Sequence, residues 1–406
     1  MANQVQKILY VSTLCSTKVW DYAFSTSDSK PGQAVQKFHR LLAVGLATHK
    51  HACNIETLSS IPVVSESHKK RMWFIKKDAE SGIAFNYIPF INLPFIKHAF
   101  HFCYTFFFVL FWGWRNKRSK PVVVCDILNM TISLAALYAS KLNRTKITAI
   151  VTDLPGLMVS SQSRKSIKSK VYAFFVTKNI RHFSGYVLLT QQMNAVVNPG
   201  NRPYIIMEGL IDKNMADTIN TLDNKSKERI LLYAGGIYEI YGINDLIKGF
   251  MMLEEPTVRL HIYGPGPMAK EMPEYCRKDI RIEYFGIVPN KQVVEAQLKA
   301  TLLINPRPAT LELSKFSFPS KNMEYMASGT PLLTTPLPGM PVEYHDYVYL
   351  ICNDSSLGIH EELRKLLYLS PEELHNMGAK AKKFVLEKKN NETQGKRLLK
   401  FLNESA

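Results

Sequence analysis

The segment Phe318-Pro-Ser-Lys-Asn-Met-Glu-Tyr-Met-Ala-Ser-Gly-Thr-Pro331 predicts a short helix, a turn and the start of an apolar strand. Pro319 suits the first helical position, where its missing N–H group costs nothing. Free N–H groups at a helix start favour an anion, and Lys321 adds a positive charge beside them. Glu324 follows about one turn later, on the face that carries Ser320 and Lys321. This spacing suits a nucleotide diphosphate, because a carboxylate accepts hydrogen bonds from both ribose hydroxyls. The alternative is an ordinary capped helix with a solvated Lys and Glu.

The run from Lys321 to Pro331 resembles the donor-site helix of GT-B glycosyltransferases, in particular the retaining enzymes of family 4. The resemblance implies an α/β fold, with two Rossmann-like domains whose parallel sheets face each other across a cleft. It also implies that Glu324 holds the donor ribose. The family usually carries another Glu eight residues earlier, where this chain has Phe316. The contact with the donor sugar therefore departs from the family pattern.

The chain has 406 residues, which is enough for two domains with ample cores. Its net charge of +17 is unevenly distributed, because residues 1–205 carry 26 Lys or Arg against 8 Asp or Glu. Such asymmetry indicates an anionic partner for the first half, either a membrane surface or nucleic acid. We expect the membrane, because no stacking or recognition motif for nucleic acid accompanies the charge.

The six cysteines are scattered, and no pair has metal-ligand or redox spacing. Several lie in apolar runs, which predicts buried free thiols in a reducing compartment. The sequence shows no signal peptide ahead of the first apolar run. We therefore expect a cytoplasmic protein, attached peripherally to the inner face of the cell membrane.

Strands alternate with helices through the first half, which predicts a Rossmann-like domain over residues 1–205. The first strand, Lys7–Thr13, leads into a long polar loop from Leu14 to Gly32 and then a helix from Gln33 to Leu46. The resemblance implies that Gly32, at that helix start, approaches the donor phosphates or the acceptor; a surface turn is the alternative. The other expected strands are Asn54–Leu58, Ile83–Ile88, Val122–Ile127, Ile147–Asp153, Tyr186–Thr190 and Tyr204–Met207.

One apolar segment of this half, Phe95–Trp114, is followed by Arg115, Lys117, Arg118 and Lys120. It has three possible roles: a core crossover helix, a helix that presents aromatic residues to a bilayer, or a transmembrane span. Lys69–Lys77 forms a second basic and aromatic patch, which either rests on anionic lipid or is a solvated loop.

Two acidic residues follow strands of the first half. Asp153 ends a predicted strand just before a sharp turn, and a residue at the carboxyl end of a parallel strand faces the ligand crevice. It is our candidate for a catalytic polar group near the reacting centre, and Asp126 is the second choice. Helix capping is the alternative for both.

The second half, residues 206–385, predicts another Rossmann-like domain, and residues 386–406 predict a final helix that returns to the first domain. Gly235 and Gly236 follow its first strand and let the backbone approach a ligand closely. The resemblance places this loop beside the donor diphosphate. In the family an Arg and a Lys come shortly afterwards, where this chain has Tyr238 and Tyr241. Lys321 and Arg307 are the candidates to supply that charge instead.

Two further strands of this half end in glycine at the crevice. Gly264 follows the first of them, and the resemblance implies that the second loop holds the nucleotide base through backbone groups near Gly286, Ile287 and Val288. No Asp-x-Asp motif is present, so we expect no metal and no cofactor other than the nucleotide sugar itself.

These features predict a glycosyltransferase that moves a sugar, from a UDP-sugar by our interpretation, to a saccharide or lipid-linked saccharide during cell-surface polysaccharide synthesis. The partners expected are the nucleotide-sugar donor, that acceptor and an anionic membrane surface. Preorganised donors at the helix start, with Lys321, would stabilise the departing diphosphate. Two alternatives stay open: a nucleotide-sugar 2-epimerase of the same fold, and a non-catalytic saccharide-binding relative, which Phe316 suggests.

Overall fold

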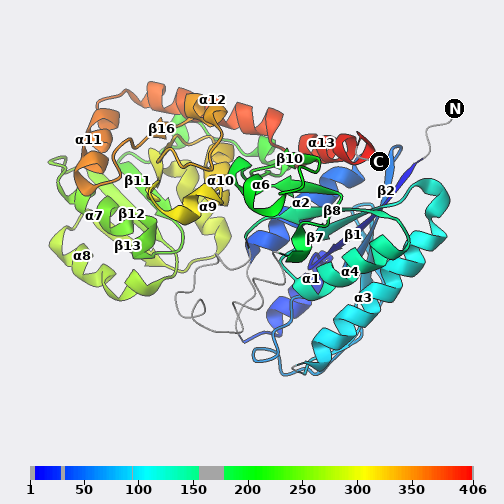
Figure 1. Ribbon diagram of the computed structural model, residues 1–406. Coiled ribbons are helices and arrows are strands. Elements are labelled where there is room, and N and C mark those ends of the chain that lie inside the picture. Colours follow the sequence, from blue (N-terminus) through cyan, green and yellow to red (C-terminus); the bar gives the residue numbers. More distant parts are fainter. Residues whose placement is uncertain (1–4, 29–32, 94, 155–177, 405–406) are drawn as a thin grey trace. The chain divides into compact units, whose positions relative to one another are not determined.

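The computed structural model describes residues 5–28, 33–93, 95–154 and 178–404 (Figure 1). The chain divides into two compact units. The first comprises the chain up to Leu210 together with the C-terminal segment from Asn391, and the second comprises Ile211–Asn390. The chain therefore leaves the first unit once, builds the whole of the second, and then returns to finish the first.

The first unit is built on an eight-stranded sheet with the order β10-β9-β8-β7-β1-β2-β5-β4. All neighbouring pairs are parallel except β4 and β5 at one edge. Every residue of the central strand β7 is buried, as expected of a parallel strand covered on both faces. The strands are β1 (Gln6–Ser12), β2 (Cys53–Ser59), β4 (Asp78–Glu80), β5 (Ile83–Tyr87), β7 (Val122–Asp126), β8 (Lys146–Val151), β9 (Gly185–Leu188) and β10 (Tyr204–Ile206). The predicted Rossmann-like sheet is confirmed.

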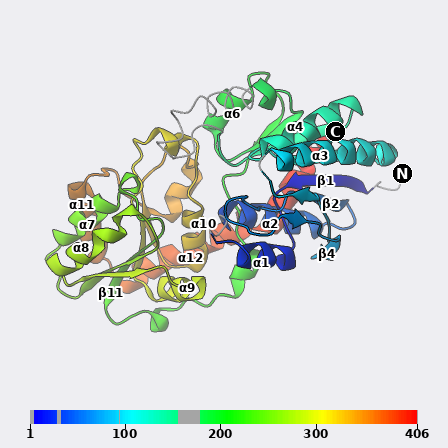
Figure 2. The ribbon, with the colours of Figure 1, turned by 90° about the horizontal axis from the view of Figure 1, so that it is seen from below.

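Helices cover both faces of this sheet. Helices α2 and α13 pack together on one face, whereas α3 and α4 pack together on the other (Figure 2). Helices α2 and α13 come into backbone contact, since a Cβ atom added to Gly45 would lie 1.8 Å from the carbonyl oxygen of Asn391. A two-stranded ribbon of β3 (Met72–Trp73) and β6 (Phe90–Ile91) adjoins α3. The helices are α1 (Thr17–Ser25), α2 (Gln33–Ala47), α3 (Ile96–Arg115), α4 (Met130–Leu142), α6 (Gln191–Val197) and α13 (Asn391–Glu404).

The loop expected from Leu14 to Gly32 is wrong over Thr17–Ser25, which forms helix α1. The Ser16 side chain caps this helix by accepting a hydrogen bond from the N–H of Val19 (3.4 Å). Ser16 also donates to the Asp78 carboxylate (2.6 Å), so a residue distant in sequence fixes the cap. The sequence also predicts a helix over Ser169–His182, most of which lies outside the described residues.

Helix α3 accounts for the aromatic segment Phe95–Trp114. Its buried face consists of His101, Thr105, Val109, Trp112 and Gly113 and faces α4, as a core crossover helix requires. Its opposite face is exposed. Over the described part of the chain, no helix combines the length and the apolar character needed to cross a bilayer.

The second unit contains a six-stranded, entirely parallel sheet with the order β13-β12-β11-β14-β15-β16. One face carries α7, α8 and α11, and the other carries α9, α10 and α12, each over its own hydrophobic core. This confirms the second Rossmann-like fold. The elements are β11 (Arg229–Ala234), β12 (Val258–Tyr263), β13 (Ile282–Gly286), β14 (Leu302–Asn305), β15 (Leu332–Thr334), β16 (Tyr349–Leu350), α7 (Ile243–Met251), α8 (Met272–Lys278), α9 (Asn290–Lys299), α10 (Ser320–Ser328), α11 (Ser356–Leu367) and α12 (Pro371–Lys388).

Candidate functional site

The carboxyl ends of the strands in the second unit bring the predicted glycine loops together. The N–H of Gly235 donates to the carbonyl oxygen of Tyr263 (2.8 Å), and the N–H of Gly264 donates to that of Gly286 (2.7 Å). Gly264 has a φ of +121°, and a Cβ atom added there would lie 2.0 Å from the carbonyl oxygen of Gly235. Only glycine fits this position, so the loops after β11, β12 and β13 form one backbone surface. Ile287 and Val288 follow directly, Ile287 exposed and Val288 half-buried.

Helix α10 begins beside this surface. Pro319 occupies the cap position rather than the first helical position, and no side chain caps the helix start. Ser320 is the first helical residue and is exposed. An uncapped helix start leaves backbone N–H groups available to an anion. Glu324 is half-buried one turn further along the helix.

Lys321 connects the helix start to the glycine loop. Its Nζ atom donates a hydrogen bond to the carbonyl oxygen of Ala234, the last residue of β11. A Cβ atom added to Gly235 would lie 2.4 Å from the same Nζ atom. Burial lowers the pKa of Lys321 to about 8, while the nearby Glu324 carboxylate acts in the opposite direction. The charge of Lys321 is thus held at the loop and poorly solvated, which strengthens its attraction for an anion.

Two tyrosines that sequence reasoning missed fix the peptide groups on either side of Gly235. The Tyr325 hydroxyl accepts a hydrogen bond from the N–H of Ala234 (2.8 Å) and donates to its carbonyl oxygen (3.0 Å). The Tyr233 hydroxyl donates to the carbonyl oxygen of Gly236 (2.8 Å). The sequence signal for Tyr325 is its position on α10, one turn after Lys321. Together these bonds make the loop a rigid, preorganised element.

Arg307 lies on the loop that follows β14, and its guanidinium carbon is 5.2 Å from the centre of the Tyr241 ring. The ring of Tyr238 in turn packs edge-on against Tyr241, with 5.4 Å between the centroids. The two loops touch, because a Cβ atom added to Gly242 would lie 2.2 Å from the carbonyl oxygen of Pro306. Tyr241, which stands where the resemblance implies a basic residue, therefore contacts an arginine from another loop.

Residues 215–384 match the family model for glycosyl transferases group 1. The second unit therefore contains a glycosyl transferases group 1 domain. The match covers α10 and the loops that follow β11, β12, β13 and β14. No curated protein sequence matches the chain.

Solved structures show that the chain has the GT-B fold. Sucrose-phosphate synthase from Thermosynechococcus elongatus is similar over 98% of both chains, with a TM-score of 0.65 and 13% identity. Anabaena HepE in complex with UDP is similar over 98% of this chain and all of its own, with a TM-score of 0.63 and 12% identity. The pneumococcal O-GlcNAc transferase GtfA, solved with UDP and GlcNAc, is similar over 98% of this chain and 99% of its own, with a TM-score of 0.57 and 11% identity.

The two acidic candidates of the first unit have different surroundings. Asp153 follows β8 and is half-buried. Asp126 is fully buried: its Oδ2 atom is 3.3 Å from Nε2 of His39, whose Nδ1 atom is 2.7 Å from the Tyr10 hydroxyl. Its other oxygen accepts a hydrogen bond from the N–H of Leu128 (3.0 Å). The second choice is therefore a structural residue, because a fully buried carboxylate offers no surface to a substrate.

Gly32, the candidate ahead of α2, lies outside the described residues. Phe316, where the family usually has a Glu, is half-buried at the end of a short helical turn, Glu312–Lys315. Within the described residues, no cluster of His, Cys, Asp or Glu side chains is arranged to hold a metal ion.

Proposed function

We propose that the enzyme transfers a sugar from a UDP-sugar to a saccharide or lipid-linked saccharide, with retention of the anomeric configuration. The contact of Lys321 with the glycine loop carries the proposal, because it places a desolvated cation against a backbone that a diphosphate can approach. Support for the nucleotide comes from HepE and GtfA, whose solved structures contain UDP.

Each part of the donor has a matching group in the second unit. The diphosphate would lie against Gly235 and Gly236 at the start of α10, with Lys321 and Arg307 balancing its charge. Glu324 would accept hydrogen bonds from the ribose hydroxyls. Backbone groups of Gly264 and of the segment ending at Ile287 and Val288 would hold the base.

Transfer breaks the bond between the anomeric carbon and the β-phosphate oxygen, and UDP leaves with the electron pair. The acceptor hydroxyl forms the new bond to that carbon and passes its proton to the departing β-phosphate oxygen of UDP. Lys321, Arg307 and the free N–H groups of α10 would stabilise the charge that develops on UDP, so we propose a reaction without a metal ion. We propose that Asp153 provides the polar group near the anomeric carbon.

The acceptor is proposed to be a lipid-linked saccharide at the cytoplasmic face of the cell membrane, in the assembly of cell-surface polysaccharide. The support is the positive charge of residues 1–205, which favours an anionic surface.

Calorimetric titration with UDP tests the donor site, and a radiolabelled UDP-sugar panel with extracted membrane lipids tests transfer. We expect UDP to bind in the presence of EDTA and label to enter the lipid fraction. Failure of UDP to bind would overturn the proposal. Conversion of the UDP-sugar alone to an epimer would replace the transferase with an epimerase.

A further inference from the structure

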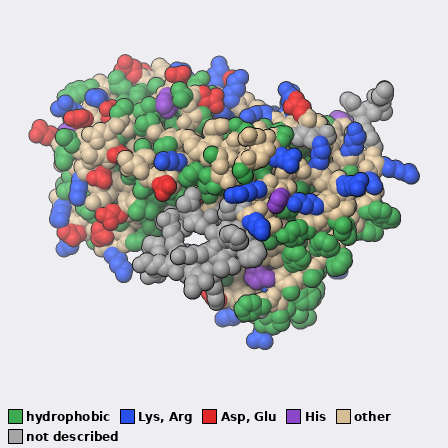
Figure 3. Space-filling model, viewed as in Figure 1, with side chains coloured by type: hydrophobic (Ala, Val, Ile, Leu, Met, Phe, Trp, Pro, Cys, Tyr) green, Lys and Arg blue, Asp and Glu red, His purple; other side chains and the backbone are tan. Residues whose placement is uncertain are grey.

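Helix α3 exposes an aromatic stripe that the fold of the first unit does not use. The stripe consists of Phe100, Tyr104, Phe107, Phe111 and Trp114, whose spacings of three and four place them on one helical face. Trp114 is 68% exposed and Phe107 is 65% exposed. Apolar side chains gather at this corner of the molecule, along α3 (Figure 3). Contiguous apolar surface of this kind marks an interaction site.

Basic residues flank the stripe at both ends. Arg115, Lys117, Arg118 and Lys120 follow its C-terminal end, and the turn after α4 adds Arg144. The β3–β6 ribbon adjoins α3, and the segment Lys69–Lys77 that contains β3 carries the exposed side chains of Met72 and Phe74. Both ends of the aromatic stripe therefore lie near positive charge.

Acidic residues are nearly missing from this part of the sequence. Between Glu80 and Asp153 the only one is Asp126, which is fully buried. A protein partner of mixed charge would meet no exposed carboxylate between Glu80 and Asp153. A surface of aromatic rings bordered mainly by cations matches the negative headgroups and apolar interior of an anionic bilayer.

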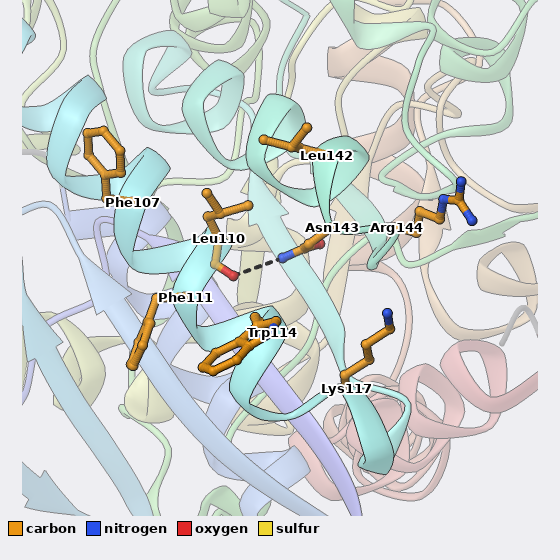
Figure 4. A pocket seen from close by; sticks show the side chains of 8 residues that line it. All are labelled: Phe107, Leu110, Phe111, Trp114, Lys117, Leu142, Asn143 and Arg144. Atoms are coloured by element: carbon orange, nitrogen blue, oxygen red, sulfur yellow. Dashed lines mark hydrogen bonds between the residues drawn. The ribbon is translucent and has the colours of Figure 1, made fainter.

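A hollow of about 760 Å³ opens at the C-terminal end of α3 (Figure 4). Its apolar wall is formed by Phe107, Leu110, Phe111, Trp114 and Leu142, and its polar lining includes Lys117, Asn143 and Arg144. Asn143 donates a hydrogen bond to the carbonyl oxygen of Leu110 (3.2 Å), which ties the turn after α4 to α3. The combination of aromatic wall and two cations suits the phosphate and first methylene groups of a phospholipid.

We propose that α3 lies in the plane of an anionic phospholipid bilayer, with its aromatic stripe at the boundary between headgroups and acyl chains. The hollow at its C-terminal end receives a lipid phosphate between Lys117 and Arg144. A helix of 20 residues is about 30 Å long, and cations at both ends reach the same layer of headgroups only if the helix lies flat. This inference deepens the membrane part of the proposed function by naming the surface involved.

Vesicle flotation tests the docking, with phosphatidylcholine alone and phosphatidylcholine mixed with phosphatidylglycerol. The wild-type chain should float with the mixed vesicles. Phe107→Ser combined with Phe111→Ser should abolish flotation, whereas Tyr368→Ser, which changes an even more exposed ring in the second unit, should not change it. Lys117→Glu combined with Arg144→Glu should weaken binding to the mixed vesicles by roughly tenfold or more. Lys248→Glu with Lys270→Glu, exposed lysines of the second unit, is the matched charge control.

Depth is tested by quenching tryptophan fluorescence with brominated lipids. Quenching should be lost in Trp114→Phe and retained in Trp20→Phe. Flotation that persists in the Phe107 and Phe111 variant, or a stripe that instead buries itself in a dimer seen by sedimentation, would overturn the inference. UDP binding, measured in the same variants, should be unchanged. Absent flotation with intact UDP binding therefore rejects only the docking surface, whereas absent UDP binding in the wild-type chain rejects the proposed function.

Discussion

The amine of Lys321 donates a hydrogen bond to the carbonyl oxygen of Ala234, which joins the start of α10 to the end of β11. A charged side chain that is largely buried costs stability, because water no longer solvates it. Function explains such a group better than stability does, because the charge faces a loop of two glycines.

Replacing Lys321 with Met should therefore separate function from stability. We expect kcat to fall by roughly 100-fold or more, as on removal of one transition-state donor elsewhere. The melting temperature should stay the same or rise, because the variant buries no charge. Calorimetric scanning and a transfer assay measure both. Wild-type turnover in this variant would remove Lys321 from the mechanism.

A methyl group at Gly235 should displace the same amine. In Gly235→Ala the new Cβ atom would lie 2.4 Å from Lys321 Nζ and 2.6 Å from the Tyr233 hydroxyl. UDP affinity should decrease, and the loss should be smaller in a chain that already carries Lys321→Met, because both changes act on one group. Gly200→Ala is the control, since a Cβ atom there meets nothing within 4 Å. Fully additive losses would contradict this coupling.

UDP binding should depend on pH near the depressed pKa of Lys321. Below pH 8 the amine is protonated in the free protein, and above pH 8 it loses its proton well before an ordinary lysine, whose pKa is 10.5. We expect UDP affinity to fall as pH rises through 8, and binding at pH 8 to take up protons. Titrations in buffers of different ionisation enthalpy measure that uptake. Equal heats in all buffers would argue against it.

The proposed ribose contact of Glu324 can be tested with a paired comparison. Glu324→Gln should weaken UDP binding by roughly 10- to 100-fold, which is the usual contribution of hydrogen bonds to a charged group. The same substitution should have little effect on binding of a 2′,3′-dideoxy analogue of UDP, which lacks both hydroxyls. Equal losses for the two ligands would show that Glu324 acts elsewhere.

The buried pair of His39 and Asp126 should matter for stability and not for the donor. Asp126→Asn should lower the free energy of unfolding by roughly 3 kcal/mol, because a buried partner is left poorly satisfied. UDP affinity should be unchanged. Asp21→Asn on the exposed side of α1 is the control and should change little. Denaturant titration measures the free energy of unfolding of each variant. An unchanged free energy of unfolding in Asp126→Asn would contradict the structural role of Asp126.

Local signals predicted the parts of the fold that depend on neighbouring residues. The helix expected after Pro319 runs from Ser320 to Ser328. It ends at Gly329, whose φ of +79° is the left-handed conformation in which glycine commonly ends a helix. The alternation of strand-like and helix-like apolar runs predicts both parallel sheets, because this pattern also depends only on residues close in sequence.

Long-range partners explain what the sequence did not reveal. Helix α1 was missed because Ser16 sits in a polar stretch and its partner Asp78 comes from β4. The sequence makes Asp126 a catalytic candidate because its buried partner, His39 on α2, is distant in sequence. Tyr325 and Tyr233 carry no sequence signal for contact with each other's loop, and only the three-dimensional structure shows that they hold the Gly235 loop.

The return of α13 to α2 has a consequence for how the protein is made. Leu398, Leu399, Phe401 and Leu402 belong to the same hydrophobic core as β1 and α2, yet a ribosome delivers them only after the whole of Ile211–Asn390. During synthesis the core of the first unit stays incomplete until α13 is made. The contiguous segment Ile211–Asn390 emerges earlier and is free to fold. A nascent chain halted after Asn390 should therefore hold a protease-resistant later segment and a protease-sensitive earlier one.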